Sequence, residues 1–184
     1  MDSIRDFLRP AATIPSNLSF VPANFRNPVH AAAIVSLLNQ YAQEPMGIGR
    51  PLPDEVKRRV VAGLRAHPTS FAYLAFGSKE PVGLVVCFTV FSTFQARPVV
   101  NIHDLYVKKS YRGRRIGREL LRLVEGKGRR LRCSKITLEV RSDNERALRL
   151  YESDGFDGER TRDGRPRTFF LEKSLGKRLR KPPS

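Results

Sequence analysis

The chain has little of several features that mark special classes of protein. Its 184 residues contain two cysteines, Cys87 and Cys133, which are too few for a disulfide framework or a four-cysteine metal site. No apolar run reaches the roughly 18 residues that a membrane span needs. The first ten residues alternate charged and apolar side chains and lack the apolar core of a signal peptide. We therefore expect a soluble, cytoplasmic protein that holds no metal and spans no membrane.

Acidic residues are also scarce. Eighteen Asp and Glu face 34 Lys and Arg, which gives a net charge of +16 and a pI near 10.7. Residues 108–132 contain eleven Lys or Arg and two Glu, so this stretch carries more than half of the excess. Such a charge suits a nucleic acid, an anionic membrane surface or a polyanionic small molecule. Charge alone leaves these three partners open.

The order of apolar patterns predicts a mixed α/β fold in one domain. Hydrophobic residues make up 40% of the chain, enough to fill a core. We expect an irregular lead-in over residues 1–17, a domain over 18–173 and a basic tail over 174–184. Period-2 patterns predict strands over 18–21, 71–76, 82–94, 99–107 and 135–140, with two more around the Asp163-Gly164 turn. Helical spacing predicts helices over 29–43, from a cap at Asp54, over 113–131, and from a capping box at Ser142 to 153.

A basic, glycine-containing segment joins a predicted strand to the predicted long helix. Residues 111–118 read Tyr-Arg-Gly-Arg-Arg-Ile-Gly-Arg. Unpaired amides at a helix N-terminus and the helix dipole both favour an anion there. Four arginines add positive charge at the same place. The glycine spacing is one residue too short for a Walker loop and lacks its lysine, and it does not fit the dinucleotide fingerprint.

Three segments, in order, resemble the GNAT superfamily of N-acetyltransferases. The basic segment resembles the motif Arg/Gln-x-x-Gly-x-Gly/Ala, with Arg112 first, Gly117 last and Arg115 where the motif usually has glycine. Residues 101–107 resemble the strand that leads into that loop. Residues 144–156 fill every landmark of Asn-x-x-Ala-x-x-x-Tyr-x-x-x-Gly-Phe. The resemblance covers roughly residues 71–172 and implies a central, mostly antiparallel sheet of about six to seven strands flanked by about four helices.

The resemblance also implies acetyl-CoA as the acyl donor. In the family the pyrophosphate rests on backbone amides of the loop, here those of Gly113, Arg114, Arg115, Ile116, Gly117 and Arg118, after Arg112. The side chain of Arg115 either reaches a phosphate or obstructs the site. The pantetheine arm would pair with the strand residues Leu105, Tyr106 and Val107, where a backbone N–H polarises the thioester carbonyl. Leu105 and Val107 serve equally well as sheet core.

Two polar residues of the last predicted helix are candidates for contact with the donor. Asn144 and Tyr151 are seven residues apart and share one helix face. The resemblance implies that Asn144 contacts acetyl-CoA and that Tyr151 donates a proton to the CoA sulfur. A phenol with a pKa near 10 is protonated at neutral pH and can act as a general acid. The alternative for Tyr151 is simple packing in the core.

The general base has three candidates. His103 and Asp104 are strand neighbours, so we expect them on opposite faces, with His103 on the face of Leu105 and Val107. An imidazole suits proton transfer near neutral pH, although a single strand histidine is often structural. By position His103 matches a Glu that spermidine/spermine acetyltransferases use. Asp104 and Glu139, the latter on the neighbouring strand, are the other candidates.

The expected function is transfer of an acetyl group from acetyl-CoA to a primary amine by direct attack. The acceptor, a small molecule or a peptide amine, should contact residues 41–51, where we interpret Glu44 as a solvated helix end. One alternative is a GNAT-fold protein that binds nucleic acid or the ribosome with little or no catalysis. The basic stretch favours it, whereas aromatic residues placed as strand core disfavour it. Another alternative is an enzyme specific for protein amines. A homodimer is compatible with each of these functions.

Overall fold

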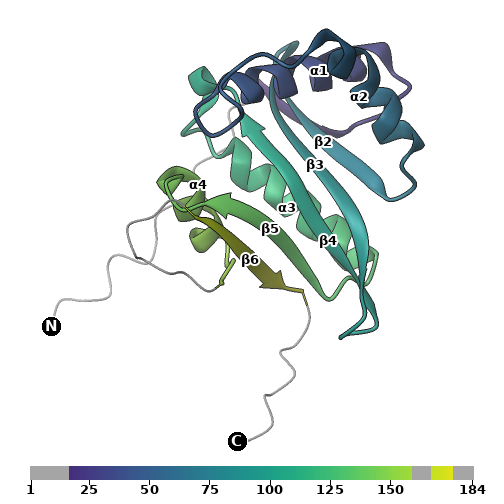
Figure 1. The fold of residues 1–184 in the computed structure, drawn as a ribbon, viewed down its shortest axis with the longest axis vertical. Helices are drawn as coiled ribbons and strands as arrows, with labels where there is room; N and C mark the ends of the chain where they lie inside the picture. The colour runs from purple at the N-terminus through teal and green to yellow at the C-terminus, as the bar shows by residue number, and fades with distance from the viewer. Residues whose placement is uncertain (1–16, 159–166, 176–184) are drawn as a thin grey trace, which may run out of the picture.

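The computed structural model describes residues 17–158 and 167–175, which form one six-stranded sheet with helices on both faces (Figure 1). The strands, in sheet order, are β1 Leu18–Pro22, β2 Ser70–Gly77, β3 Glu80–Ser92, β4 Arg97–Val107, β5 Lys135–Arg141 and β6 Thr168–Ser174. The helices are α1 Pro28–Gln43, α2 Asp54–Ala66, the short 3₁₀ turn η1 Lys109–Tyr111, α3 Ile116–Arg130 and α4 Glu145–Ser153. The expected mixed α/β fold is confirmed.

The sheet is antiparallel except at one place. Neighbouring strands pair antiparallel from β1 to β4 and again between β5 and β6. β4 and β5 pair in parallel, and only over Val100–Ile102 and Ile136–Leu138. Beyond these residues both strands continue without pairing to each other, β4 to Val107 and β5 to Arg141. The sheet therefore opens on this side into a V between the ends of β4 and β5.

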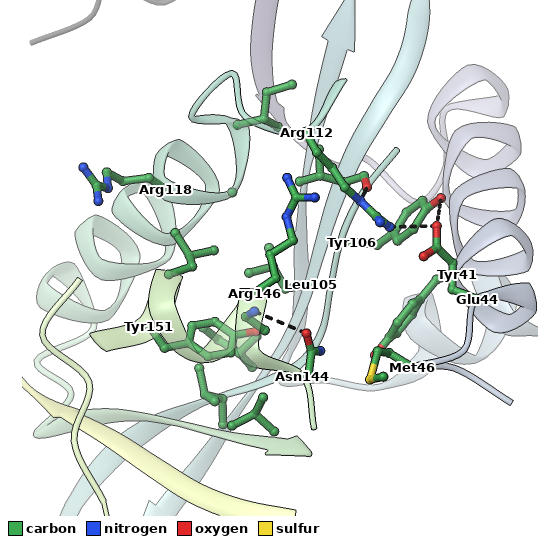
Figure 2. A pocket seen from close by; sticks show the side chains of 18 of the residues that line it. Tyr41, Glu44, Met46, Leu105, Tyr106, Arg112, Arg118, Asn144, Arg146 and Tyr151 are labelled. Carbon is green, nitrogen blue, oxygen red and sulfur yellow. Dashed lines mark hydrogen bonds and ion pairs between the residues drawn. The ribbon is translucent and has the colours of Figure 1, made fainter. Parts of the chain in front are cut away.

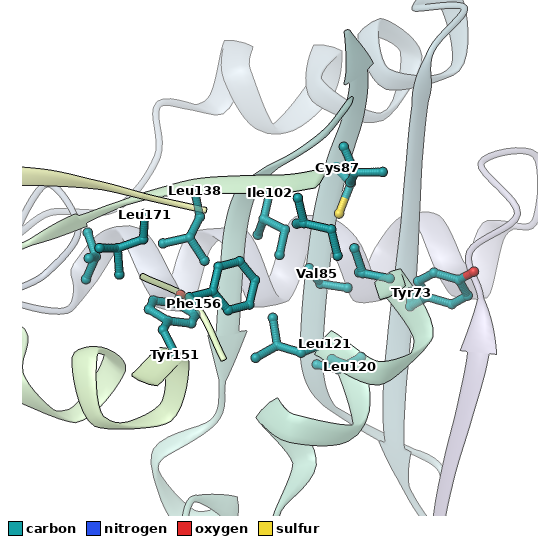
Figure 3. Packing of buried hydrophobic residues seen from close by; sticks show 14 of the residues in the cluster. Tyr73, Val85, Cys87, Ile102, Leu120, Leu121, Leu138, Tyr151, Phe156 and Leu171 are labelled. Carbon is teal, nitrogen blue, oxygen red and sulfur yellow. The ribbon is translucent and has the colours of Figure 1, made fainter. Parts of the chain in front are cut away.

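Two apolar clusters hold the helices against the sheet. On one face, Ile34 and Leu37 of α1 and Leu64 of α2 pack on Leu74 and Leu84 of the strands. On the other face, the buried side of α3 packs on β3, β4 and β5, and α4 joins the same cluster (Figure 3). Each fully buried Leu or Ile contributes about 1.5–3 kcal/mol. The second cluster fixes α3 and α4 against the sheet, while the first fixes α1 and α2.

A β-bulge changes the direction of side chains near the end of β4. Val86 of β3 pairs with Asp104 and the next residue, Cys87, pairs with Ile102, so His103 is the extra residue of the bulge. Because the extra residue interrupts the alternation, His103 and Asp104 lie side by side, with Nδ1 and Oδ2 3.6 Å apart. The expectation that they occupy opposite faces is wrong.

Three predicted helix starts are also corrected. α3 begins at Ile116 rather than Gly113, because Gly113 and Arg115 have positive φ angles of 83° and 61°, which no helix accommodates. Asp54 is the first residue of α2 and pairs with Lys57, while Pro53 occupies the cap position. The capping box at Ser142 does not form: Asn144 caps α4, and the hydroxyl of Ser142 accepts a hydrogen bond from the amide of Arg167.

Some of the predicted segments lie outside the described residues. Residues 1–16, the Asp163-Gly164 turn and residues 176–184 lie outside them, and β6 represents the last predicted strand. The long β3–β4 hairpin departs from the expectation that aromatic residues form core, since Phe91 and Phe94 are exposed, as is the apolar Val90. Among the described residues, no helix is both long and apolar enough to cross a bilayer.

Two glycine substitutions test whether the left-handed backbone at Gly155 terminates α4, with a glycine inside α2 as the contrast. Gly155 follows α4 with a φ of 88°, so Gly155→Ala should lower the free energy of unfolding by about 1–2 kcal/mol. Gly63 lies inside α2 with no atom near an added Cβ, so Gly63→Ala should raise it by about 0.5–1 kcal/mol. Urea denaturation of both variants measures the two shifts. Equal shifts of the same sign would contradict the assignment of Gly155 as the helix terminator.

Candidate active site

The opening between β4 and β5 is a cavity of about 960 Å³, large enough for a cofactor-sized ligand. Its walls come from the end of α1, the second half of β4, the segment before α3, the first turns of α3 and α4, and β5. The residues predicted from sequence that line it are His103, Leu105, Tyr106, Val107, Arg112, Gly113, Arg115, Ile116, Gly117, Arg118, Glu139, Asn144 and Tyr151. Asp104 and Arg114 are not among the lining residues.

The N-terminus of α3 presents open backbone donors to this cavity. The first helical hydrogen bond is made by the amide of Glu119 to the carbonyl of Arg115, so the amides of residues 116–118 precede it. No side chain caps this helix end. Orphan amides together with the helix dipole favour an anion. The residues present therefore fit the diphosphate of an acyl-CoA donor.

Arg115, which stands where the GNAT motif usually has glycine, adopts the left-handed conformation, with φ 61° and ψ 8°. For a residue other than glycine this conformation costs of the order of 1–2 kcal/mol. Its side chain lines the cavity. Arg114 instead places its guanidinium 4.8 Å from the ring centre of Tyr111.

Gly117 has a packing role that the sequence did not suggest. A Cβ atom built at this position would lie 3.0 Å from Cδ2 of Leu150 on α4 and 3.9 Å from Cγ2 of Val107. Glycine at 117 therefore lets α3 approach α4 closely. Leu150 also lines the cavity, so the same contact shapes the wall next to the N-terminus of α3.

Arg112 and Glu44 form an ion pair that the sequence interpretation missed. Nη2 of Arg112 lies 2.7 Å from Oε1 of Glu44, and 22% of each side chain is exposed. Nε of Arg112 also donates to the carbonyl of Val107 at 2.9 Å. The interpretation of Glu44 as a solvated helix end is wrong. The guanidinium of Arg112 therefore links the end of α1 to the end of β4, as Figure 2 shows, and both of these interactions are with other groups of the protein.

Tyr106 and Tyr41 complete this corner of the cavity. The hydroxyl of Tyr106 donates to Oε1 of Glu44 at 3.4 Å, and its ring stacks on Tyr41 with centres 5.6 Å apart. Burial, followed by the charge of Glu44, raises the pKa of Tyr106 above its ordinary value. Met46, in the loop after α1, lines the same wall.

Tyr151 lies on the opposite side of the cavity, on α4 (Figure 2). It is 7% exposed and its ring packs near Phe156, with centres 5.7 Å apart. Burial, and then the nearby hydroxyl of Tyr41, raises the pKa of Tyr151 well above 10. The phenol is therefore protonated throughout the neutral range. It both packs in the core and faces the cavity, so the two interpretations from sequence are compatible.

Asn144 has a structural task in addition to its place in the cavity wall. Its Oδ1 accepts a hydrogen bond from the amide of Ala147 at 3.2 Å and so caps α4. Its amide nitrogen takes no part in the cap. Arg146, in the same turn, lines the cavity as well (Figure 2). In the motif Asn-x-x-Ala, Arg146 is one of the two unspecified positions between Asn144 and Ala147, so the sequence did not single it out.

The bulge determines where the base candidates lie. His103 lines the cavity with a side chain that is 65% exposed, and its ring meets Phe88 with centres 5.7 Å apart. Asp104 beside it is more buried, and this burial raises the pKa of its carboxyl, an effect that His103 partly opposes. Glu139 projects from β5 into the cavity wall. Among the described residues no group of His, Cys, Asp and Glu could hold a metal ion.

Comparison with known proteins identifies the family of this chain. Residues 32–156 match the model of the Acetyltransferase (GNAT) family. The N-alpha-acetyltransferase 30 of Saccharomyces cerevisiae is 29% identical over 143 residues, which cover 74% of each chain. The thialysine N-epsilon-acetyltransferase of Bos taurus is 34% identical over 74 residues, 40% of this chain and 43% of that one. A chain of the crystal structure of the NatC complex bound to Gag peptide and CoA superposes with a TM-score of 0.68 at 25% identity, covering 87% of this chain and 99% of that one.

The chain belongs to the GNAT acetyltransferase family. It is an N-acetyltransferase whose donor is acetyl-CoA, as the family match and the NatC neighbour indicate.

Substitutions of Arg115 test the importance of the left-handed turn before α3. Arg115→Val places a β-branched residue in that conformation and should lower the free energy of unfolding by about 1–2 kcal/mol and weaken acetyl-CoA binding. Arg115→Gly keeps the turn and should retain binding. Thermal unfolding and calorimetric titration of both variants give the two quantities. Equal affinities for the Val and Gly variants would show that this conformation does not form the donor site.

Proposed function

We propose that the protein transfers the acetyl group of acetyl-CoA to the amine of a peptide by direct attack, with Tyr151 as the general acid. The observation that carries this proposal is the position of Tyr151. Its buried, protonated phenol lies in one wall of a cavity whose other walls hold the open amides of α3 and the unpaired edge of β4. An acid, an anion site and a free strand edge are thus within one enclosure.

The donor half of the cavity is formed by backbone groups. The amides of Ile116, Gly117 and Arg118 would hold the diphosphate, and Arg115 and Arg146 add positive charge at the rim. The edge of β4 from Leu105 to Val107 would pair with the pantetheine amides, since β5 has diverged from it. A backbone N–H of this edge then polarises the thioester carbonyl. The bound thioester supplies the acetyl carbon.

The proton steps can be assigned to side chains. The amine nitrogen forms its bond to the acetyl carbon while the carbon–sulfur bond breaks, and Tyr151 protonates the departing thiolate. The amine loses its own proton to a base. The adjacent His103 and Asp104 are suited to this as a pair, because the exposed imidazole reaches solvent and the cavity and its Nδ1 lies 3.6 Å from the carboxyl group of Asp104. Glu139, on the opposite strand, is the alternative.

The acceptor half favours a peptide over a polyamine. Tyr41 and Met46 give it an apolar wall, and the carboxylate of Glu44 is neutralised by Arg112. A polyamine would need several unpaired carboxylates. The similarity to N-alpha-acetyltransferase 30 and to a NatC structure that holds a Gag peptide supports a peptide α-amine.

An acceptor panel tests the substrate class. Acetyl-CoA turnover, followed by thiol release, should be highest with short peptides bearing a free α-amine, and absent when that amine is acetylated beforehand. Spermidine, thialysine and free lysine serve as the small-amine arm. Faster turnover with any of these than with every peptide would replace the peptide acceptor with a small one and leave the transferase assignment intact.

Tyr151→Phe tests the general acid. Removing the hydroxyl should lower kcat by about 10²-fold or more, because the thiolate then leaves without a proton donor. The dissociation constant for acetyl-CoA should stay close to that of the native protein. Tyr111→Phe is the matched control, since Tyr111 also lines the cavity but its hydroxyl bonds to Glu80 at 3.0 Å. An unchanged kcat in Tyr151→Phe would remove Tyr151 from the chemistry.

A further inference from the structure

The carboxyl end of α1 holds an acidic residue where helix electrostatics disfavour one. The C-terminus of a helix carries partial negative charge, so a cation is preferred there. α1 has no basic residue in its last turn, and its C-cap is Glu44. The carboxylate is instead compensated from a distant part of the chain, by Arg112 at 2.7 Å. Since Glu44 does not stabilise α1 at this position, we infer that its pairing with Arg112 has another role.

The side chain of Arg112 connects the end of β4 to the end of α1. It precedes Gly113, the first glycine of the segment that leads to the open amides of α3. Its Nε holds the carbonyl of Val107, the last residue of β4, and its Nη2 holds Glu44. Among the ion pairs of the described residues, this one alone joins α1 or α2 to another part of the domain.

Backbone hydrogen bonds hold the loop after Glu44 against the end of α1. The amide of Gly47 donates to the carbonyl of Glu44 at 2.9 Å, and the amide of Ile48 donates to that of Ala42 at 3.0 Å. A Cβ at position 47 would lie 2.3 Å from the carbonyl oxygen of Tyr41. A shift of Glu44 should therefore also move the loop that carries Met46, which lines the acceptor half of the cavity.

We propose that Glu44 and Arg112 are positioning residues that couple the two halves of the site: occupation of the donor half fixes Arg112, and Glu44 then fixes the α1–α2 loop that contacts the acceptor. This inference rests on the proposed acetyl transfer. The pair is only 22% exposed at each side chain, so water screens it less than a surface pair. Tyr106, bonded to Glu44 and stacked on Tyr41, extends the same connection to the acceptor wall.

Hydrogen–deuterium exchange with CoA as the ligand tests the coupling without knowledge of the acceptor. In the native protein CoA should slow exchange both in residues 113–118 and in the loop amides of Gly47, Ile48 and Leu52, the last of which donates to Oδ1 of Asn39 at 2.9 Å. Glu44→Gln should keep the first effect and lose the second. Glu55→Gln, which breaks the exposed pair with Arg59 on α2, should behave as the native protein.

The outcomes separate the coupling from the function on which it rests. No protection of residues 113–118 in the native protein would overturn the donor site, and the coupling with it. Protection of residues 113–118 without protection of the α1–α2 loop would overturn the coupling alone. Persistence of loop protection in Glu44→Gln would do the same.

Kinetics with the best peptide of the acceptor panel give a second readout. Glu44→Gln and Arg112→Gln should each raise the peptide KM by about tenfold, a size typical of coupling between sites. The double variant should be no worse than either single one. Arg112→Lys keeps the charge and loses the Nε donor to Val107, so its KM should fall between those of the native protein and Arg112→Gln. Additive losses in the double variant, or losses that merely follow the melting temperature, would contradict the coupling.

Discussion

The site depends on the short parallel pairing between β4 and β5. Three residues of each strand pair, and then the strands separate. A longer ladder would satisfy the edge of β4 within the sheet and leave no room for a ligand. The apolar clusters on both faces keep the sheet together despite this opening. The separation thus creates the cavity, exposes the backbone edge of β4 and brings the ends of α1, α3 and α4 to its rim.

The electrostatics of the cavity divide it into two halves. Open amides of α3, with Arg115 and Arg146, make one half suited to an anion. The other half has tyrosines, a methionine and a carboxylate that is already paired. Burial raises the pKa of the Tyr151 phenol, which lines the same cavity. Three arginines of the most basic segment, Arg112, Arg115 and Arg118, line this cavity.

Much of this could be predicted from the sequence because it is local. Alternation of apolar residues places the strands, and the landmarks from Asn144 to Phe156 place α4 and Tyr151. The errors arise where distant residues decide. The bulge at His103 depends on its pairing with β3, and Ser142 bonds to Arg167 instead of capping α4. Glu44 and Arg112 are 68 positions apart, so no spacing rule connects them. The left-handed backbone of Arg115 is a further difference, since helical spacing predicts a helix that already includes this residue.

Calorimetric titration of the native protein and of Gly113→Val with acetyl-CoA tests the central claim most directly. Gly113 has a φ of 83° and no atom within 4 Å of an added Cβ, so valine there strains the backbone of the loop without clashing with a neighbouring residue. The native protein should bind one acetyl-CoA with a micromolar dissociation constant, and the variant should bind far more weakly. Absence of binding to the native protein, or equal binding to both, would contradict a donor site formed by this loop and the N-terminus of α3.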